Sequence, residues 1–128
     1  MTSNRQVGIV GLGLLGSAIA ERLIAAGFRP HGFDIDPATR AAFERRGGVF
    51  APSLAEIATR CDPLILAVYN TEQVEAVVER EILPAVGGRS DKLVLCVSTC
   101  DPDRVAALAQ RMASKGLYLL ETPRRHLS

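Results

Sequence analysis

Short apolar runs alternate along the chain with longer segments whose apolar residues recur every three or four positions. The short runs are typical of strands buried on both faces, and the longer segments are typical of amphipathic helices. Strands are predicted, in chain order, at residues 6–10, 32–34, 49–50, 64–68, 92–97 and 117–120. The segments between them predict helices, so strand and helix alternate from one end of the chain to the other.

Helix boundaries are marked by residues with a mechanical role. Asp36-Pro37 and Asp101-Pro102 each combine an N-cap with a first-turn proline, and Ser53 with Glu56 forms a capping box. No hairpin signal joins two strands, so the strands are expected to run parallel, with right-handed crossovers and helices on both faces. The prediction is an α/β domain with a doubly wound parallel sheet of about six strands, in the order 3-2-1-4-5-6.

A glycine motif gives this sheet a chemical role. Gly11-Leu-Gly13-Leu-Leu-Gly16 follows the first predicted strand directly and opens the first helix, with Leu14 and Leu15 between the last two glycines. In this context Gly11 permits the tight turn, Gly13 lets a pyrophosphate approach the backbone, and Gly16 lets helix and strand pack closely. The helix N-terminus adds free N–H groups and a partial positive charge. The motif predicts a Rossmann-type site for a dinucleotide.

Asp34, at the end of the second predicted strand, is the second candidate. An acid there can accept hydrogen bonds from the adenosine ribose. Because Asp36 already caps the following helix, we expect Asp34 to have no structural task of its own. Its charge favours NAD over NADP, which carries a ribose 2′-phosphate. Arg40 lies close enough in sequence to weaken that inference, so NADP stays open.

The ligand crevice of such a sheet lies at the carboxyl ends of the first and fourth strands. Val68, Tyr69 and Asn70 are therefore expected beside the glycine loop, although helix capping explains Asn70 equally well. Thr99, one strand further along, is predicted to contact the cofactor on its nicotinamide side. Ser98 is a weaker candidate for a substrate contact.

Composition narrows the classes of partner. The 128 residues carry 15 Lys plus Arg against 14 Asp plus Glu and no Trp, which argues against nucleic-acid binding. The longest apolar run is too short to span a membrane. Three cysteines without nearby histidines predict neither a disulfide framework nor a metal site, which fits a cytoplasmic protein. His31, Lys92 and Lys115 are expected at the surface.

The sequence resembles the amino-terminal domain of β-hydroxyacid dehydrogenases, the relatives of 3-hydroxyisobutyrate and 6-phosphogluconate dehydrogenase. The resemblance rests on residues 8–16, on Asp34, on the Ser-Thr-Cys-Asp-Pro segment at 98–102 and on the Glu-Thr-Pro segment at 121–123. It implies hydride transfer between NAD(P) and a small β-hydroxyacid. It also implies that Gly11 to Gly16 hold the pyrophosphate, that Asp34 binds ribose, and that Val68 to Asn70 and Thr99 line the cofactor.

The match ends near residue 123. Residues 124–128 form a polar tail that departs from the family pattern, and the all-helical domain that carries the family's catalytic lysine is absent from the sequence. We therefore expect residues 1–123 to be a dinucleotide-binding domain that contains no catalytic residue and does not turn over substrate alone. Loss of a neighbouring domain would also expose an apolar patch near the last strand and favour self-association.

Two other functions remain open at this point. A self-sufficient dinucleotide-binding module could sense redox state or serve a separate subunit. An S-adenosylmethionine-dependent methyltransferase also combines a glycine-rich loop with an acid at the second strand, although the glycine spacing fits a dinucleotide better.

Overall fold

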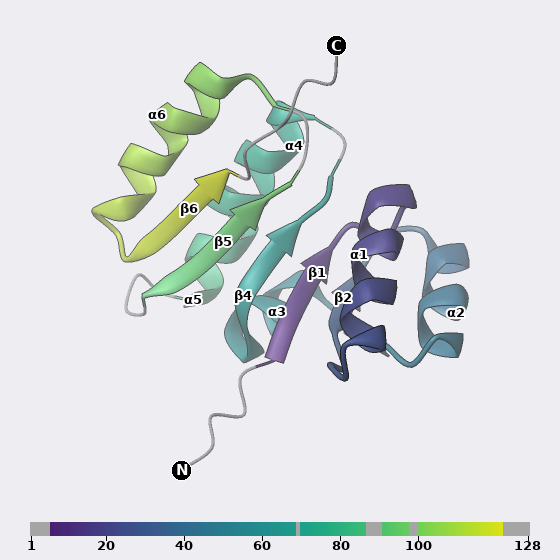
Figure 1. Cartoon of the computed structure of the whole chain (residues 1–128). Coiled ribbons are helices and arrows are strands. Elements are labelled where there is room, and N and C mark those ends of the chain that lie inside the picture. The colour runs from purple at the N-terminus through teal and green to yellow at the C-terminus, as the bar shows by residue number, and fades with distance from the viewer. Residues whose placement is uncertain (1–5, 69, 87–90, 98–99, 122–128) are drawn as a thin grey trace.

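Six parallel strands form the central sheet, in the order β3-β2-β1-β4-β5-β6 (Figure 1). The computed structural model describes residues 6–68, 70–86, 91–97 and 100–121. The strands are β1 Gln6–Val10, β2 His31–Phe33, β3 Val49–Phe50, β4 Cys61–Leu66, β5 Lys92–Cys96 and β6 Leu117–Glu121. The predicted α/β class and strand order are both confirmed.

Helices cover both faces of this sheet, as the parallel connections require. They are α1 Leu14–Ala25, α2 Pro37–Arg45, α3 Leu54–Arg60, α4 Thr71–Ala76, the π-helical segment η1 Val77–Ile82, α5 Leu83–Val86 and α6 Pro102–Ala113. The predicted caps hold: the Asp36, Ser53 and Asp101 side chains each accept a backbone N–H from the first turn of their helix. Local sequence signals therefore mark where three of these helices begin.

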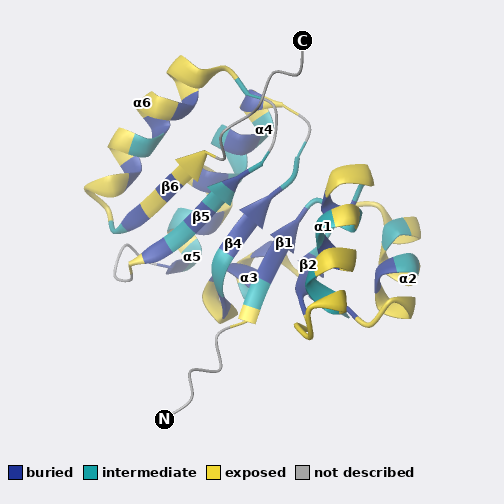
Figure 2. Ribbon diagram, viewed as in Figure 1, coloured by how far each residue is buried: buried dark blue, intermediate teal, exposed yellow. Residues whose placement is uncertain are grey.

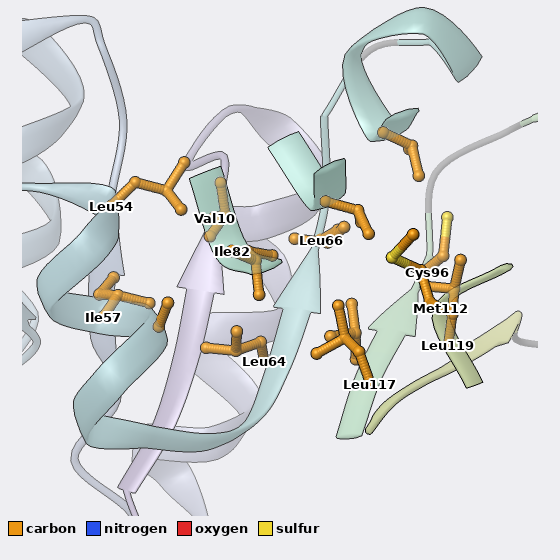
Figure 3. Packing of buried hydrophobic residues seen from close by; sticks show 14 of the residues in the cluster. Val10, Leu54, Ile57, Leu64, Leu66, Ile82, Cys96, Met112, Leu117 and Leu119 are labelled. Carbon is orange, nitrogen blue, oxygen red and sulfur yellow. The ribbon is translucent and has the colours of Figure 1, made fainter. Parts of the chain in front are cut away.

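The two faces of the sheet carry separate hydrophobic cores. The larger core joins α3, η1 and α6 to the sheet, and Figure 3 shows Leu64 and Ile82 between Ile57 on one side and Leu117 on the other. The smaller core lies under α1 and α2. The solvent-facing sides of α1, α2 and α6 are largely exposed (Figure 2), so the packing is that of a doubly wound sheet.

Apart from shifts of one residue at the ends of β2, β5 and β6, two elements differ from the sequence prediction. β4 begins at Cys61, earlier than predicted, because that residue pairs with Gln6 of β1 and is fully buried despite the Asp62-Pro63 pair that follows. The helix that starts after Asn70 widens into the π-helical segment η1. No turn residue marks this change in winding, so the spacing of apolar residues could not reveal it.

Two side chains predicted at the surface are buried. His31 is 9% exposed and Lys92 is 6% exposed. His31 begins β2, which lies between β1 and β3. The pKa of His31 is lowered, mainly by burial and to a smaller extent by the positive charges of Arg60 and Arg29. The Lys92 ammonium donates a hydrogen bond to the Cys61 carbonyl. A polar residue at the first position of an inner strand is therefore not a reliable sign of exposure.

Candidate functional site

The turn between β1 and α1 is closed in a way that only glycine permits at two positions. Gly11 has φ +98°, and a Cβ there would lie 2.4 Å from the Ala67 carbonyl oxygen. A Cβ on Gly16 would lie 1.8 Å from the carbonyl oxygen of Gly11. Both glycines therefore let backbone pack directly on backbone, as the motif predicted for the tight turn and for close packing of the helix.

Three hydrogen bonds fix the loop between these glycines. The Gly11 N–H donates to the Phe33 carbonyl at 2.9 Å, and the Ser17 hydroxyl donates to the Leu12 carbonyl at 2.8 Å. The Leu12 N–H donates to Asp34 Oδ2 at 2.7 Å. The loop is thus tied to the end of β2 and to the first turn of α1, so its shape is set before any ligand arrives.

The amino end of α1 is suited to an anion. Gly13 is its N-cap residue, with extended φ and ψ, and no side chain hydrogen-bonds to the first turn. The first turn also contains no acidic residue. Backbone N–H groups and the helix dipole therefore act together at this point without a competing carboxylate in the first turn.

Asp34 follows β2 directly and has the structural task that the sequence did not indicate. Its Oδ2 accepts the Leu12 N–H, and its Oδ1 accepts the Asp36 N–H at 2.9 Å. The expectation that Asp34 has no structural role is therefore wrong. An ionised carboxylate has about four lone-pair sites, so two backbone bonds leave acceptor capacity for a ligand hydroxyl.

A groove of about 660 Å³ runs past the glycine loop. Its lining comes from the β1–α1 loop, the end of β2, the β3–α3 connection, the end of β4, and α4 with η1. The lining residues are Val10, Gly11, Gly13, Leu14, Leu15, Phe33, Asp34, Ile35, Pro52, Ser53, Leu54, Ala67, Val68, Gln73, Ala76, Val77 and Glu81. Segments far apart in sequence therefore meet at the carboxyl edge of the sheet.

The ionisable side chains that line this groove are both acidic. Asp34 and Glu81 are its two ionisable lining residues, and no Lys, Arg or His of the described chain lines it. Arg40, the first cation after Asp34 in sequence, is not in the lining. Its guanidinium carbon lies 4.9 Å from the centroid of the Phe50 ring, and its Nε lies 3.5 Å from Glu44 Oε1.

Most predicted site residues that the structure describes meet in this groove. Gly11, Gly13, Leu14, Leu15, Asp34 and Val68 line it, and Gly16 shapes the loop beneath. Asn70 is not in the lining: its Oδ1 accepts the Gln73 N–H at 2.9 Å and caps α4. The predictions for Tyr69, Ser98 and Thr99 lie outside the described residues.

Sequence reasoning missed one wall of the groove. Ile35 follows β2. Pro52 lies in the β3–α3 connection and Leu54 begins α3, while Val77 and Glu81 lie on η1. The predicted strand order places the connection after β3 at the same edge of the sheet as the glycine loop, and this was the signal available for Pro52 and Leu54. No sequence signal indicated the π-helical segment.

Other kinds of site find no support in the described residues. No three His, Cys, Asp or Glu side chains in these parts of the chain gather where they could hold a metal ion. Among the same residues, no helix has the length and hydropathy that crossing a bilayer requires.

Comparison with known proteins agrees with this geometry. Residues 6–124 match the family described as the NAD binding domain of 6-phosphogluconate dehydrogenase. The chain belongs to this family. The family match spans the glycine loop, Asp34 and every strand of the sheet.

Relatives of this NAD-binding domain occur in longer proteins. L-threonate dehydrogenase of Cupriavidus necator is 37% identical over 120 residues, which are 94% of this chain and 40% of that protein. Mitochondrial 3-hydroxyisobutyrate dehydrogenase of Drosophila melanogaster is 29% identical over 93% of this chain and 36% of its own length. The solved structure of 3-hydroxyisobutyrate dehydrogenase from Salmonella typhimurium has a TM-score of 0.80 at 27% identity, covering 91% of this chain and 40% of that one.

The chain thus spans about 40% of the length of L-threonate dehydrogenase of Cupriavidus necator and of 3-hydroxyisobutyrate dehydrogenase from Salmonella typhimurium. The domain is not confined to proteins named as dehydrogenases. Cytokine-like nuclear factor N-PAC of Xenopus tropicalis is 29% identical over 94% of this chain and 23% of its own length. The domain alone therefore does not fix the activity of the protein that contains it.

Proposed function

We propose that this chain is the NAD-binding half of an oxidoreductase that transfers a hydride between NAD and a small β-hydroxyacid. One observation supports this most directly. An uncapped helix N-terminus, a glycine loop closed backbone on backbone, and a strand-end carboxylate share one groove. A dinucleotide would present its pyrophosphate to the loop and the helix end and a ribose to the carboxylate.

The pyrophosphate would lie against the first turn of α1. Gly13, Leu14 and Leu15 line the groove, so their backbone N–H groups are the proposed donors, and the helix dipole favours the negative charge. The loop needs no rearrangement because its hydrogen bonds are already made within the protein. Binding would therefore cost little ordering of the backbone.

The adenosine ribose would lie at Asp34. The lone pairs that are not used by Leu12 and Asp36 can accept its hydroxyl protons. The same carboxylate then holds the loop and the sugar, so phosphate and ribose recognition depend on one residue. Replacing Asp34 should weaken both, and the loop would lose a hydrogen bond to a charged group.

NAD is the preferred cofactor because the groove is acidic. A ribose 2′-phosphate would meet Asp34 and Glu81 without a lining cation to pair with it. Paired titrations of the chain with NADH and NADPH test this. We expect NADH to bind at least about tenfold more tightly, which is about 1.4 kcal/mol. Equal affinities would refute the preference, and no binding of either at millimolar concentration would refute the site.

The names of two relatives support the proposed substrate class. The relatives are named for L-threonate and 3-hydroxyisobutyrate, which are both small hydroxyacids. When bound, the nicotinamide ring supplies or accepts the hydride. Lys92 does not suit proton transfer at that point, because it begins β5, at the opposite edge of the sheet from the groove, and donates to the Cys61 carbonyl.

We infer that residues 1–123 act as the dinucleotide-binding domain and that turnover needs groups outside the 128 residues. The test combines NADH binding with an activity assay on a panel of small hydroxyacids. Binding without NAD reduction is expected. Reduction of NAD by the chain alone would refute the inference.

A dinucleotide-binding module without turnover in any context is the second candidate, favoured by the occurrence of the domain in N-PAC. Adding a purified helical domain from a homologous dehydrogenase to the chain separates the two. Restored NAD reduction supports the dehydrogenase half, and NADH binding that never leads to turnover supports the module. Family membership and glycine spacing speak against a methyltransferase, and S-adenosylmethionine binding without NADH binding would reverse that judgement.

Self-association is the remaining part of the proposal. Tyr118 and Leu120 on the edge strand β6 are 44% and 53% exposed. Large apolar side chains on an open strand edge favour contact with a second copy. Sedimentation at increasing concentration should show dimers or larger species, whereas a monomer at all concentrations would contradict the expectation.

A further inference from the structure

Two of the three cysteines lie together at the carboxyl edge of the sheet. The Sγ atoms of Cys96 and Cys100 are 3.7 Å apart. Cys96 is the last residue of β5 and is fully buried, whereas Cys100 is partly exposed and immediately precedes the cap of α6. One buried sulfur therefore lies beside one that solvent can reach.

Contacts on both sides hold this pair in place. The Val97 N–H, next to Cys96, donates to the Leu66 carbonyl at 3.0 Å. The Asp101 N–H, next to Cys100, donates to the hydroxyl of the buried Thr71 at 2.9 Å. Each cysteine is thus one residue from a hydrogen bond to a neighbouring element, and Cys100 packs against the larger core. These contacts therefore keep the two sulfur atoms close to each other in the folded chain.

The third cysteine provides a contrast. Cys61 begins β4, at the opposite edge of the sheet from the end of β5, and is fully buried. Burial raises the pKa of its thiol to about 11. It has neither a neighbouring thiol among the contacts described nor the exposure that an oxidant needs, so the three cysteines differ sharply in expected reactivity.

We propose that Cys96 and Cys100 are a site of reversible oxidation, at which a peroxide converts the two thiols into an intramolecular disulfide. The sulfurs must approach from 3.7 Å to about 2.05 Å, the length of a disulfide bond. In sequence, Thr99 lies between the two cysteines, and it is the residue predicted to contact the cofactor on its nicotinamide side. The disulfide itself does not depend on the proposed cofactor.

The chemistry balances in two steps. The Cys100 thiolate attacks one peroxide oxygen, the O–O bond breaks, and a sulfenic acid and one water form after proton transfer. The Cys96 sulfur then attacks the Cys100 sulfur, the S–O bond breaks, and the second water leaves with the Cys96 proton. The two thiols lose two electrons and two protons, and one peroxide is reduced to two waters. A dithiol reductant reverses the bond by exchange.

Thiol titration after unfolding is the first measurement. The chain has three cysteines, so treatment with a small excess of hydrogen peroxide should leave one reactive thiol and a mass lower by two hydrogen atoms. Peptide mapping should recover residues 96 and 100 in one linked fragment, and dithiothreitol should restore all three thiols. Three thiols remaining, a bond that includes Cys61, or disulfide-linked dimers on a non-reducing gel would each overturn the proposal.

Variants separate the attacking cysteine from the resolving one. Cys100→Ser should reduce the rate of thiol loss at least tenfold, while the matched control Cys61→Ser should still lose both of its thiols. Cys96→Ala should stop at the sulfenic acid, which dimedone traps on Cys100. Circular dichroism checks that each variant is folded. If Cys100→Ser oxidises as fast as the wild type, or if dimedone labels wild type and Cys96→Ala equally, the pair does not react as proposed.

Discussion

Gly16→Ala tests whether the backbone contact at the glycine loop is required for cofactor binding. The new Cβ would lie 1.8 Å from the Gly11 carbonyl oxygen, whereas Cβ contacts below 3.0 Å essentially never occur. The loop or the helix must therefore move by more than an ångström. The atom in the way is backbone, so no side-chain rotation can relieve the contact.

Two effects on stability compete in this variant. Alanine gains up to about 1 kcal/mol over glycine inside a helix. Overpacking typically costs about 1–3 kcal/mol, and contact with a fixed carbonyl puts Gly16 at the upper end of that range. We expect a net loss of about 2 kcal/mol in the free energy of unfolding and a fall in Tm of about 8 °C. The displaced loop should weaken NADH binding at least about tenfold.

Gly27→Ala is the matched control. Gly27 has φ +97°, and a Cβ there meets nothing within 4 Å. A left-handed alanine costs about 1–2 kcal/mol, so this variant loses similar stability far from the loop. Isothermal titration with NADH, at a temperature at which circular dichroism shows all three proteins folded, should give a wild-type Kd for Gly27→Ala alone. Wild-type affinity in Gly16→Ala would refute the role given to the backbone contact.

Three further outcomes test the local chemistry. Asp101→Ala removes a side chain that accepts two first-turn amides of α6 at 2.9 and 3.3 Å, and urea unfolding should show a loss of about 1 kcal/mol. Iodoacetamide at pH 9 should modify Cys100 but not buried Cys61, whose pKa is about 11, as peptide mass spectrometry would show; equal labelling would contradict the assigned burial. Burial lowers the folded-state pKa of Lys92, so the folded state binds fewer protons than the unfolded state between that value and 10.5, and stability rises with pH there. The raised pKa of Cys61 has the opposite effect, because the folded state binds more protons between pH 9 and about 11 and stability falls with pH there. In urea unfolding, the free energy of unfolding of Lys92→Met should therefore fall more steeply with pH across this range than that of the wild type. Parallel profiles for the two proteins would contradict the lowered pKa of Lys92.

The glycine loop and the helix caps could be predicted because each depends on neighbours in sequence, and the sheet order because alternating strands and helices follow the rule for doubly wound sheets. Strand, glycines and helix follow one another within residues 6–25, and the caps at Asp36 and Asp101 need only the next three residues. His31 and Lys92 could not be placed in this way. Their burial depends on how side chains pack around the first residues of these strands, and a polar residue at a strand start has the same sequence signature whether that position is covered or open.

Asp34 shows most clearly what the fold adds to the motif. Sequence spacing assigned its carboxylate to a ribose, and the structure shows that both oxygens already accept backbone N–H groups, one of them from the glycine loop. A carboxylate held in this way is fixed in position before a ligand binds, so little side-chain entropy remains to be lost.

Exposed apolar side chains also line the groove that contains Asp34. Leu14 is 95% exposed and Ile35 is 89% exposed, and both line the groove. Burial of such surface by a ligand is favourable at about 25 cal/mol per Å². Rigid polar groups and exposed apolar side chains are thus combined in one groove, and this combination suits a ligand that carries both charged phosphates and a flat, largely apolar ring.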